Sequence, residues 1–147
     1  MPSLRYLPLT LAVLAVILLS RLSLVELRTE EGHVRRVLVT CDAPVVLEFN
    51  NSLTRSLVRL KFKACGGLWA EGIETDPGTL EYYSGGFWDV NESARSFRAE
   101  RLRFCSADEF IVRVGEVTKR TWETCIEISA VNFVDILSGL LPIPREE

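Results

Sequence analysis

Four cysteines are the residues of this chain whose number and spacing point most directly to chemistry. They are Cys41, Cys65, Cys105 and Cys125, and no two of them form a Cys-x-x-Cys pair. Zinc sites generally use close pairs of cysteine or histidine, and the single histidine is His33, so we expect no metal site. An even number of spaced cysteines after an apolar leader is typical of two disulfides in an exported protein. Of the possible connectivities we expect Cys41–Cys65 and Cys105–Cys125, because each pair flanks neighbouring strand candidates.

The other ionisable side chains do not suggest a catalytic site. Acid–base and nucleophilic catalysis most often use histidine, and His33 ends the charged segment "ELRTEEGH". Asp108 and Glu109 are adjacent, but neighbouring residues on a strand point to opposite faces, so adjacency alone builds no two-carboxylate site. The glycine pairs lack the lysine and the following helix of a phosphate loop. We therefore expect no enzyme activity and no cofactor.

A group of aromatic residues is the best candidate for a binding surface. Its members are Trp69, Tyr82, Tyr83, Phe87 and Trp88. Aromatic rings combine flat apolar faces with polar edges, which suits a sugar or a protein partner. The alternative is that alternate members fill the core, since two neighbours on a strand cannot both face inward.

Two Asn-x-Ser motifs are candidate glycosylation sites, with Asn50 and Asn91 as the acceptors. They agree with an extracellular surface. The chain has 17 basic and 20 acidic residues and a formal net charge of −3. Its sequence pI of about 5.3 argues against nucleic-acid binding, which usually requires a strongly basic face.

The N-terminal segment determines where these residues fold. No charge occurs between Tyr6 and Ser20, and counting on past Arg21 to Val25 makes residues 6–25 long enough to enter a bilayer. A secretory signal would also need a small-residue cleavage site, and none follows. We favour a retained signal-anchor helix over a cleaved signal peptide, with a buried core helix as a third alternative. Either export route places the remainder outside the cytoplasm, attached to the membrane by one pass or secreted after cleavage.

The expected organisation has four parts. Residues 1–25 form the signal peptide or transmembrane helix, and residues 26–33 form a polar spacer. Residues 34–134 form one extracytoplasmic domain, and residues 135–147 form a tail that is a last strand, a short helix or a segment held by another chain.

Within the domain the dominant hydrophobic period is two, which is typical of half-buried strands. Val58, Leu60, Phe62 and Ala64 alternate with charged residues, and the same pattern recurs in residues 35–41, 44–50, 109–117 and 122–131, where Trp122 aligns with Ile126. Turn residues separate these segments, so we expect an all-β, immunoglobulin-like antiparallel sandwich of about 7–9 strands after one N-terminal hydrophobic helix. Residues 79–90 should form a hairpin closed by Ser84-Gly85-Gly86. In "FRAERLRF" the inward parity changes, which predicts a bulged strand, with a helix from Ala94 as the alternative.

These features favour a non-enzymatic, membrane-anchored protein that contacts another surface protein or its own copies. One alternative is a polymerising, pilus-like subunit in which Leu22, Leu24, Val25 and Leu27, or the tail over residues 136–143, complete a neighbour's sheet. Another is a secreted carbohydrate-binding module that uses residues 82–88.

Overall fold

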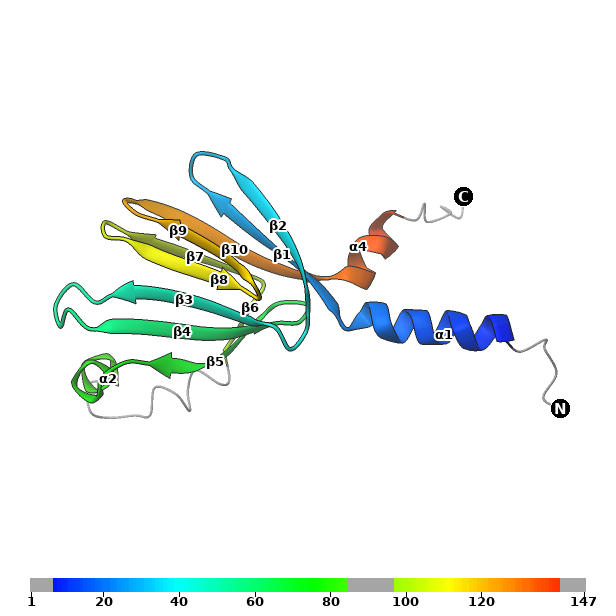
Figure 1. The fold of residues 1–147 in the computed structure, drawn as a ribbon, viewed down its shortest axis with the longest axis horizontal. Coiled ribbons are helices and arrows are strands. Elements are labelled where there is room, and N and C mark those ends of the chain that lie inside the picture. The colour runs from blue at the N-terminus through cyan, green and yellow to red at the C-terminus, as the bar shows by residue number, and fades with distance from the viewer. Residues whose placement is uncertain (1–6, 85–96, 141–147) are drawn as a thin grey trace, which may run out of the picture.

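Two antiparallel sheets packed face to face form the body of the protein, and a helix extends from one end of it (Figure 1). The computed structural model describes residues 7–84 and 97–140. The first sheet has the order β2-β1-β10-β7, and the second has the order β6-β5-β4-β3-β8-β9. The strands of the first sheet are β1 (Leu22–Thr29), β2 (Val34–Thr40), β7 (Arg101–Ser106) and β10 (Thr124–Asn132). Those of the second are β3 (Pro44–Asn50), β4 (Leu57–Ala64), β5 (Leu68–Glu74), β6 (Arg98–Ala99), β8 (Phe110–Val114) and β9 (Val117–Thr121).

The expected antiparallel sandwich is therefore confirmed as a mostly β fold, and the described residues form ten strands where the sequence predicts about 7–9. An immunoglobulin-like strand arrangement is not confirmed. The core lies between the sheets, where Val25, Leu47 and Ile128 are fully buried. Phe104 of the four-stranded sheet packs against Phe49 and Phe110 of the six-stranded sheet, with ring centroids 4.8 and 5.0 Å apart.

The inward residues of β3, β4, β8 and β10 are those that the period of two predicts. Trp122 is the exception. It lies exposed between β9 and β10, beside Glu123, whose positive φ of 51° closes the turn. The strand therefore begins two residues later than expected, at Thr124.

The first strand corrects the expected boundaries at the N-terminus. Helix α1 (Leu7–Ser20) ends before Arg21, and β1 then runs between β2 and β10 in the middle of its sheet. Residues 26–29 are thus strand, and only the turn before β2 remains of the expected spacer over residues 26–33. The physical reason is the alternation in "LSLVELRT", which turns Val25 and Leu27 into the core.

No helix in the part of the chain that the structure describes is both long and apolar enough to cross a membrane.

Most of "FRAERLRF" is strand, as expected, but its change of parity comes from a change of sheet and not from a bulge. Residues 98–99 form β6, which pairs with β5 in the six-stranded sheet, while β7 pairs with β10 in the four-stranded sheet. The chain therefore changes sheets at Glu100. The half-buried apolar residues are therefore Ala99 before the change and Leu102 and Phe104 after it, whereas Phe97 is 49% exposed.

Two further short helices lie in the residues that the structure describes. Helix α2 (Pro77–Ser84) stands where the hairpin was expected, and the rest of that hairpin lies outside the described residues. Asp76 caps α2 by accepting a hydrogen bond from the backbone N–H of Thr79 at 3.1 Å, and Pro77 occupies the first turn. The start of the tail, for which a strand, a short helix or a segment held by another chain was possible, is helical and belongs to α4 (Phe133–Leu140).

Candidate interaction surfaces of the sandwich

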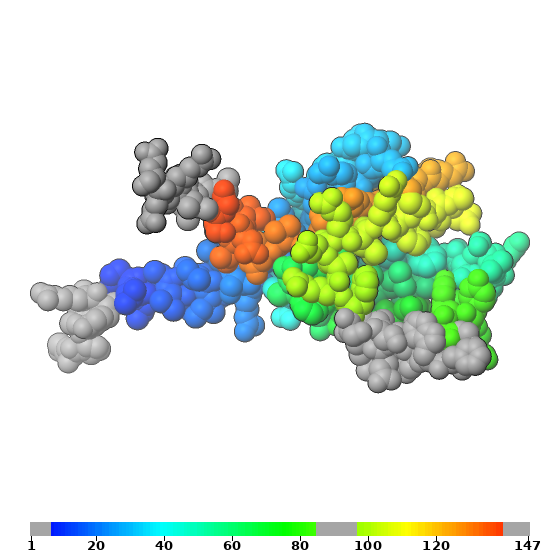
Figure 2. Space-filling model, turned by 180° about the vertical axis from the view of Figure 1, so that it is seen from behind, coloured from blue at the N-terminus to red at the C-terminus, as the bar shows by residue number. Residues whose placement is uncertain are grey.

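The two ends of the sandwich carry different structures (Figure 1). At one end, which we call the helix end, α1 and α4 leave the sheets side by side and contact each other. At the opposite end, which we call the loop end, lie α2, the loop of residues 51–56 and the turns after β1, β7 and β9. Figure 2 shows α1 projecting from the body, with α4 at its base.

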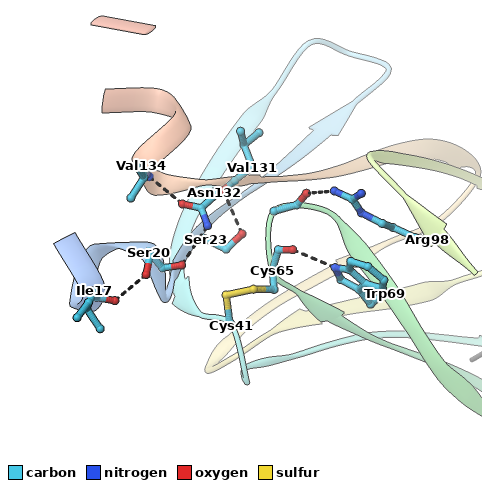
Figure 3. Close-up of a disulfide and its surroundings, with 11 residues drawn as sticks. Ile17, Ser20, Ser23, Cys41, Cys65, Trp69, Arg98, Val131, Asn132 and Val134 are labelled. Atoms are coloured by element: carbon cyan, nitrogen blue, oxygen red, sulfur yellow. Dashed lines mark hydrogen bonds between the residues drawn. A yellow bond between two sulfur atoms is a disulfide. The ribbon is translucent and has the colours of Figure 1, made fainter. Parts of the chain in front are cut away.

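Both expected disulfides are present, and none of the four cysteines is free. Cys41 follows β2 and Cys65 follows β4, so this bridge ties the two sheets together at the helix end (Figure 3). Cys105 and Cys125 face each other in the register of β7 and β10, so the second bridge reinforces an existing strand pair near the loop end.

Trp69 is held rigidly beside the Cys41–Cys65 bridge (Figure 3). Its indole Nε1 donates a hydrogen bond to the carbonyl oxygen of Cys65 at 2.9 Å. The guanidinium carbon of Arg98 lies 4.9 Å from the ring centroid, and Arg98 Nη2 donates to the carbonyl of Gly66 at 2.8 Å. The side chain is nevertheless 45% exposed, so a fixed aromatic ring faces the solvent at the helix end.

The two tyrosines of the expected aromatic surface lie elsewhere, on α2 at the loop end. Tyr83 accepts a hydrogen bond from Asn51 Nδ2 at 2.8 Å, while the ring of Tyr82 is exposed. The structure therefore does not bring Trp69 together with Tyr82 and Tyr83. Phe87 and Trp88 lie outside the described residues.

Asn51 organises the loop end. Its side-chain oxygen accepts hydrogen bonds from the backbone N–H groups of Leu53 and Thr54, both at 2.9 Å, and its amide group reaches Tyr83. Asn51 is only 8% exposed, and these bonds replace those that it would make to water. Asn51 thus stabilises the loop of residues 51–56 internally and links it to α2 through Tyr83.

A second contact joins the same loop to α2. The hydroxyl groups of Thr54 and Thr79 lie 2.8 Å apart, and Thr79 also donates to Asp76 Oδ2 at 2.6 Å. Hydrogen bonds from Ser56 and from Thr79 lower the pKa of the Asp76 carboxyl from 3.8 to about 2. Two segments that are distant in sequence are thereby joined into one rigid surface.

Sequence reasoning missed two exposed apolar residues of the loop end. Leu53 is 71% exposed at the tip of the loop that Asn51 organises, and Trp122 projects from the turn between β9 and β10. The signal for Leu53 was an isolated leucine inside the polar turn "NNSLTRS". Beside this loop, Asn50, Ser52, Arg55 and Asp108 line a surface hollow of about 520 Å³.

The candidate glycan acceptor Asn50 is exposed at the end of β3, so its amide is accessible from solvent. Asn91 lies outside the described residues. Within residues 7–84 and 97–140, no three or more histidine, cysteine, aspartate or glutamate side chains are grouped so that they could hold a metal ion.

Comparisons with protein-family models, with curated proteins and with solved structures each return no match.

Proposed function

We propose that this chain is a non-enzymatic, single-pass membrane protein whose extracytoplasmic sandwich presents its loop end to a partner protein. The observation that carries the proposal is the surface of α1. Its residues are uncharged, and all of them are exposed except Leu19, which is half-buried. A helix that is apolar on every side requires burial in protein or in lipid, and the sandwich does not bury this one.

The polar groups of α1 are also suited to a lipid environment. Thr10 Oγ1 donates to the carbonyl of Leu7 at 2.8 Å, and Ser20 Oγ donates to the carbonyl of Ile17 at 2.7 Å. Both hydroxyl groups are satisfied within the helix and need no water. Fourteen helical residues cover about 21 Å, against about 30 Å of hydrocarbon. Local thinning of the bilayer and snorkelling of Arg21 accommodate a short segment of this kind.

The two disulfides support placement of the sandwich outside the cytoplasm, because such bonds persist in oxidising compartments. With α1 in the bilayer, the loop end points away from the membrane. The nine residues of β10 span about 30 Å, so a partner would meet Leu53, Trp122 and Tyr82 at that height. Immunoglobulin-like sandwiches likewise bind their partners through loops at one end of rigid sheets.

The polymerising alternative receives less support. Donation of Leu22–Thr29 to a neighbour would remove β1 from the middle of its own sheet and expose Val25 and Leu27. The carbohydrate-binding alternative relied on a hairpin over residues 82–88, and Tyr82 and Tyr83 lie on helix α2 instead, while residues 85–88 lie outside the described residues.

The membrane claim is tested by expressing the full chain with Leu11→Arg and Leu14→Arg in α1. Both side chains are exposed, so the changes leave the sandwich core untouched. The unaltered chain should remain in membranes after an alkaline carbonate wash, whereas the double variant should be released. The matched control is Leu53→Arg, an exposed leucine of the loop end, which should remain with the membranes. Release of the unaltered chain by carbonate would refute the anchor.

A further inference from the structure

The helix end carries an apolar band that continues beyond α1 onto the outer face of the four-stranded sheet. Leu24 of β1 lies opposite Leu38 of β2 and opposite Val131 of β10. These three form one cross-strand row, on the face opposite Val25 and the core. Leu38 is 51% exposed and Val131 is 44% exposed. Helix α4 contacts β1, β10 and α1, and its exposed Leu137 extends the band.

The band ends abruptly along the strands. The next outward row contains Glu26 and Arg36, whose side chains form an ion pair at 2.9 Å. The following row contains Arg28 and Glu127. The apolar part of the face therefore reaches from Arg21 to about Leu24, which is about 10 Å at the rise of a strand. Amphipathic protein surfaces enter the boundary between headgroups and acyl chains to about 5–10 Å.

Trp69 lies on the six-stranded sheet at the same end of the sandwich, near the Cys41–Cys65 bridge (Figure 3). The backbone N–H of Cys41 donates to the carbonyl of Arg21 at 2.8 Å, the disulfide joins Cys41 to Cys65, and Trp69 binds the carbonyl of Cys65. The exposed indole is thus connected through three short links to the end of α1. Tryptophan is enriched at this depth of membrane proteins because its ring is apolar and its N–H is polar.

Asn132 fixes α4 to the base of α1 (Figure 3). Its Nδ2 donates to the carbonyl of Ser20 at 3.0 Å, while its Oδ1 caps α4 by accepting from the N–H of Val134 at 2.9 Å. One side chain therefore ends one helix and begins the other. Asn132, the last residue of β10, therefore links both helices to the four-stranded sheet.

We infer that the helix end of the sandwich is a lipid-binding surface that sits in the headgroup region of the bilayer that α1 enters. The row Leu24–Leu38–Val131 and α4 contact acyl-chain ends on one side, and Trp69 contacts the interface on the other. The sandwich is then held at a fixed tilt and does not swing on α1. This inference rests on the proposed anchoring by α1, and the lipid is identified by its chemistry, a phospholipid surface whose acyl-chain boundary takes up apolar side chains.

The test uses full-length protein in phosphatidylcholine vesicles that contain a shallow nitroxide-labelled lipid. Trp88→Phe with Trp122→Phe leaves Trp69 as the single tryptophan, and Trp69→Phe with Trp88→Phe leaves Trp122 as the single tryptophan. Both forms should float with the vesicles. Nitroxide should quench the fluorescence of Trp69 and leave that of Trp122, at the loop end, unchanged.

Two further variants isolate the apolar row. Leu38→Glu in the Trp69 form should reduce quenching while flotation is retained, because α1 is intact. The matched control Val34→Glu alters an exposed valine of the same strand at the loop end and should leave quenching unchanged.

The outcomes separate the two proposals. Failure to float would refute the anchor. Flotation with equal quenching of Trp69 and Trp122 would refute the lipid-binding surface alone. In nanodiscs that hold one chain each, quenching of Trp69 should persist. Quenching in one-chain discs that is lost when two chains share a disc would show that a second copy shields this face from lipid and would overturn the inference.

Discussion

The two disulfides provide a quantitative test of how the sandwich is stabilised. The chain-entropy relation, applied to loops of 24 and 20 residues, gives about 3.4 kcal/mol for Cys41–Cys65 and about 3.3 kcal/mol for Cys105–Cys125. Replacing either pair by alanine should therefore lower the free energy of unfolding by nearly the same amount. A typical domain has about 5–15 kcal/mol in total, so each loss would be large.

The local consequences of the two losses should differ, however. Cys105 and Cys125 lie opposite each other in an intact ladder of backbone hydrogen bonds, which survives in the Cys105→Ala, Cys125→Ala variant. Cys41 and Cys65 connect strands of different sheets, and no ladder joins β2 to β4. The Cys41→Ala, Cys65→Ala variant should therefore open locally at the helix end.

The assay combines two measurements on the full chain in mild detergent. Urea denaturation followed by tryptophan fluorescence gives the free energy of unfolding, and amide hydrogen exchange reports local opening. Exchange should accelerate at the amides of residues 41 and 65 in the first double variant, with no comparable change along β7 and β10 in the second. Losses below about 1 kcal/mol in both variants would refute the entropic reasoning. Faster exchange in β7 and β10 would refute the local assignment.

Three smaller predictions concern the loop end and the core. Because the pKa of Asp76 in the folded protein is depressed, the carboxylate stabilises the fold above pH 3.8, and this stabilisation is lost as the pH falls toward about 2. NMR titration of the Asp76 carboxyl should give a midpoint near pH 2. Asp76→Asn should remove this transition and keep α2 capped. Asn51→Ala should cost about 1–3 kcal/mol by urea denaturation, because two backbone N–H groups and the Tyr83 hydroxyl lose their partner; an unchanged midpoint would contradict this role. Leu47→Ala in the core should lower the free energy of unfolding by about 2–5 kcal/mol. Leu53→Ala at the exposed loop tip should change it by less than about 0.5 kcal/mol. Equal losses in the two variants would contradict the burial of Leu47.

Much of the fold could be predicted because apolar residues at every second position of a half-buried strand show which of its side chains face the core. That rule placed Val45, Leu47 and Val112 in the core, and it located the change of parity near Glu100. The pairing of cysteines followed from the strands that they flank. Both signals, the alternation within a strand and the cysteines next to strands, can be recognised within a short stretch of sequence.

The errors arose where one sequence feature is compatible with two structures. The alternation in β1 is hard to recognise in the sequence because Leu22, Leu24 and Val25 continue the apolar run of the preceding helix. Asp76-Pro77-Gly78 contains turn residues, but aspartate followed by proline also begins a helix, and here it does.

The aromatic surface illustrates a different limit. Parity gives the face of a sheet on which a side chain lies, but not the end of the sheet. Trp69 stands at the start of β5, whereas the tyrosines follow its last residue, so the length of the strand separates them. The exposure of Leu53 and Trp122 likewise depends on turns whose shape is set by contacts distant in sequence.

The most direct test of the central claim is the intact mass, under non-reducing conditions, of the native protein recovered from carbonate-washed membranes. We predict a chain that retains α1 and in which all four cysteines are oxidised. A soluble chain that begins near Arg21, or a chain with four free thiols, would contradict it.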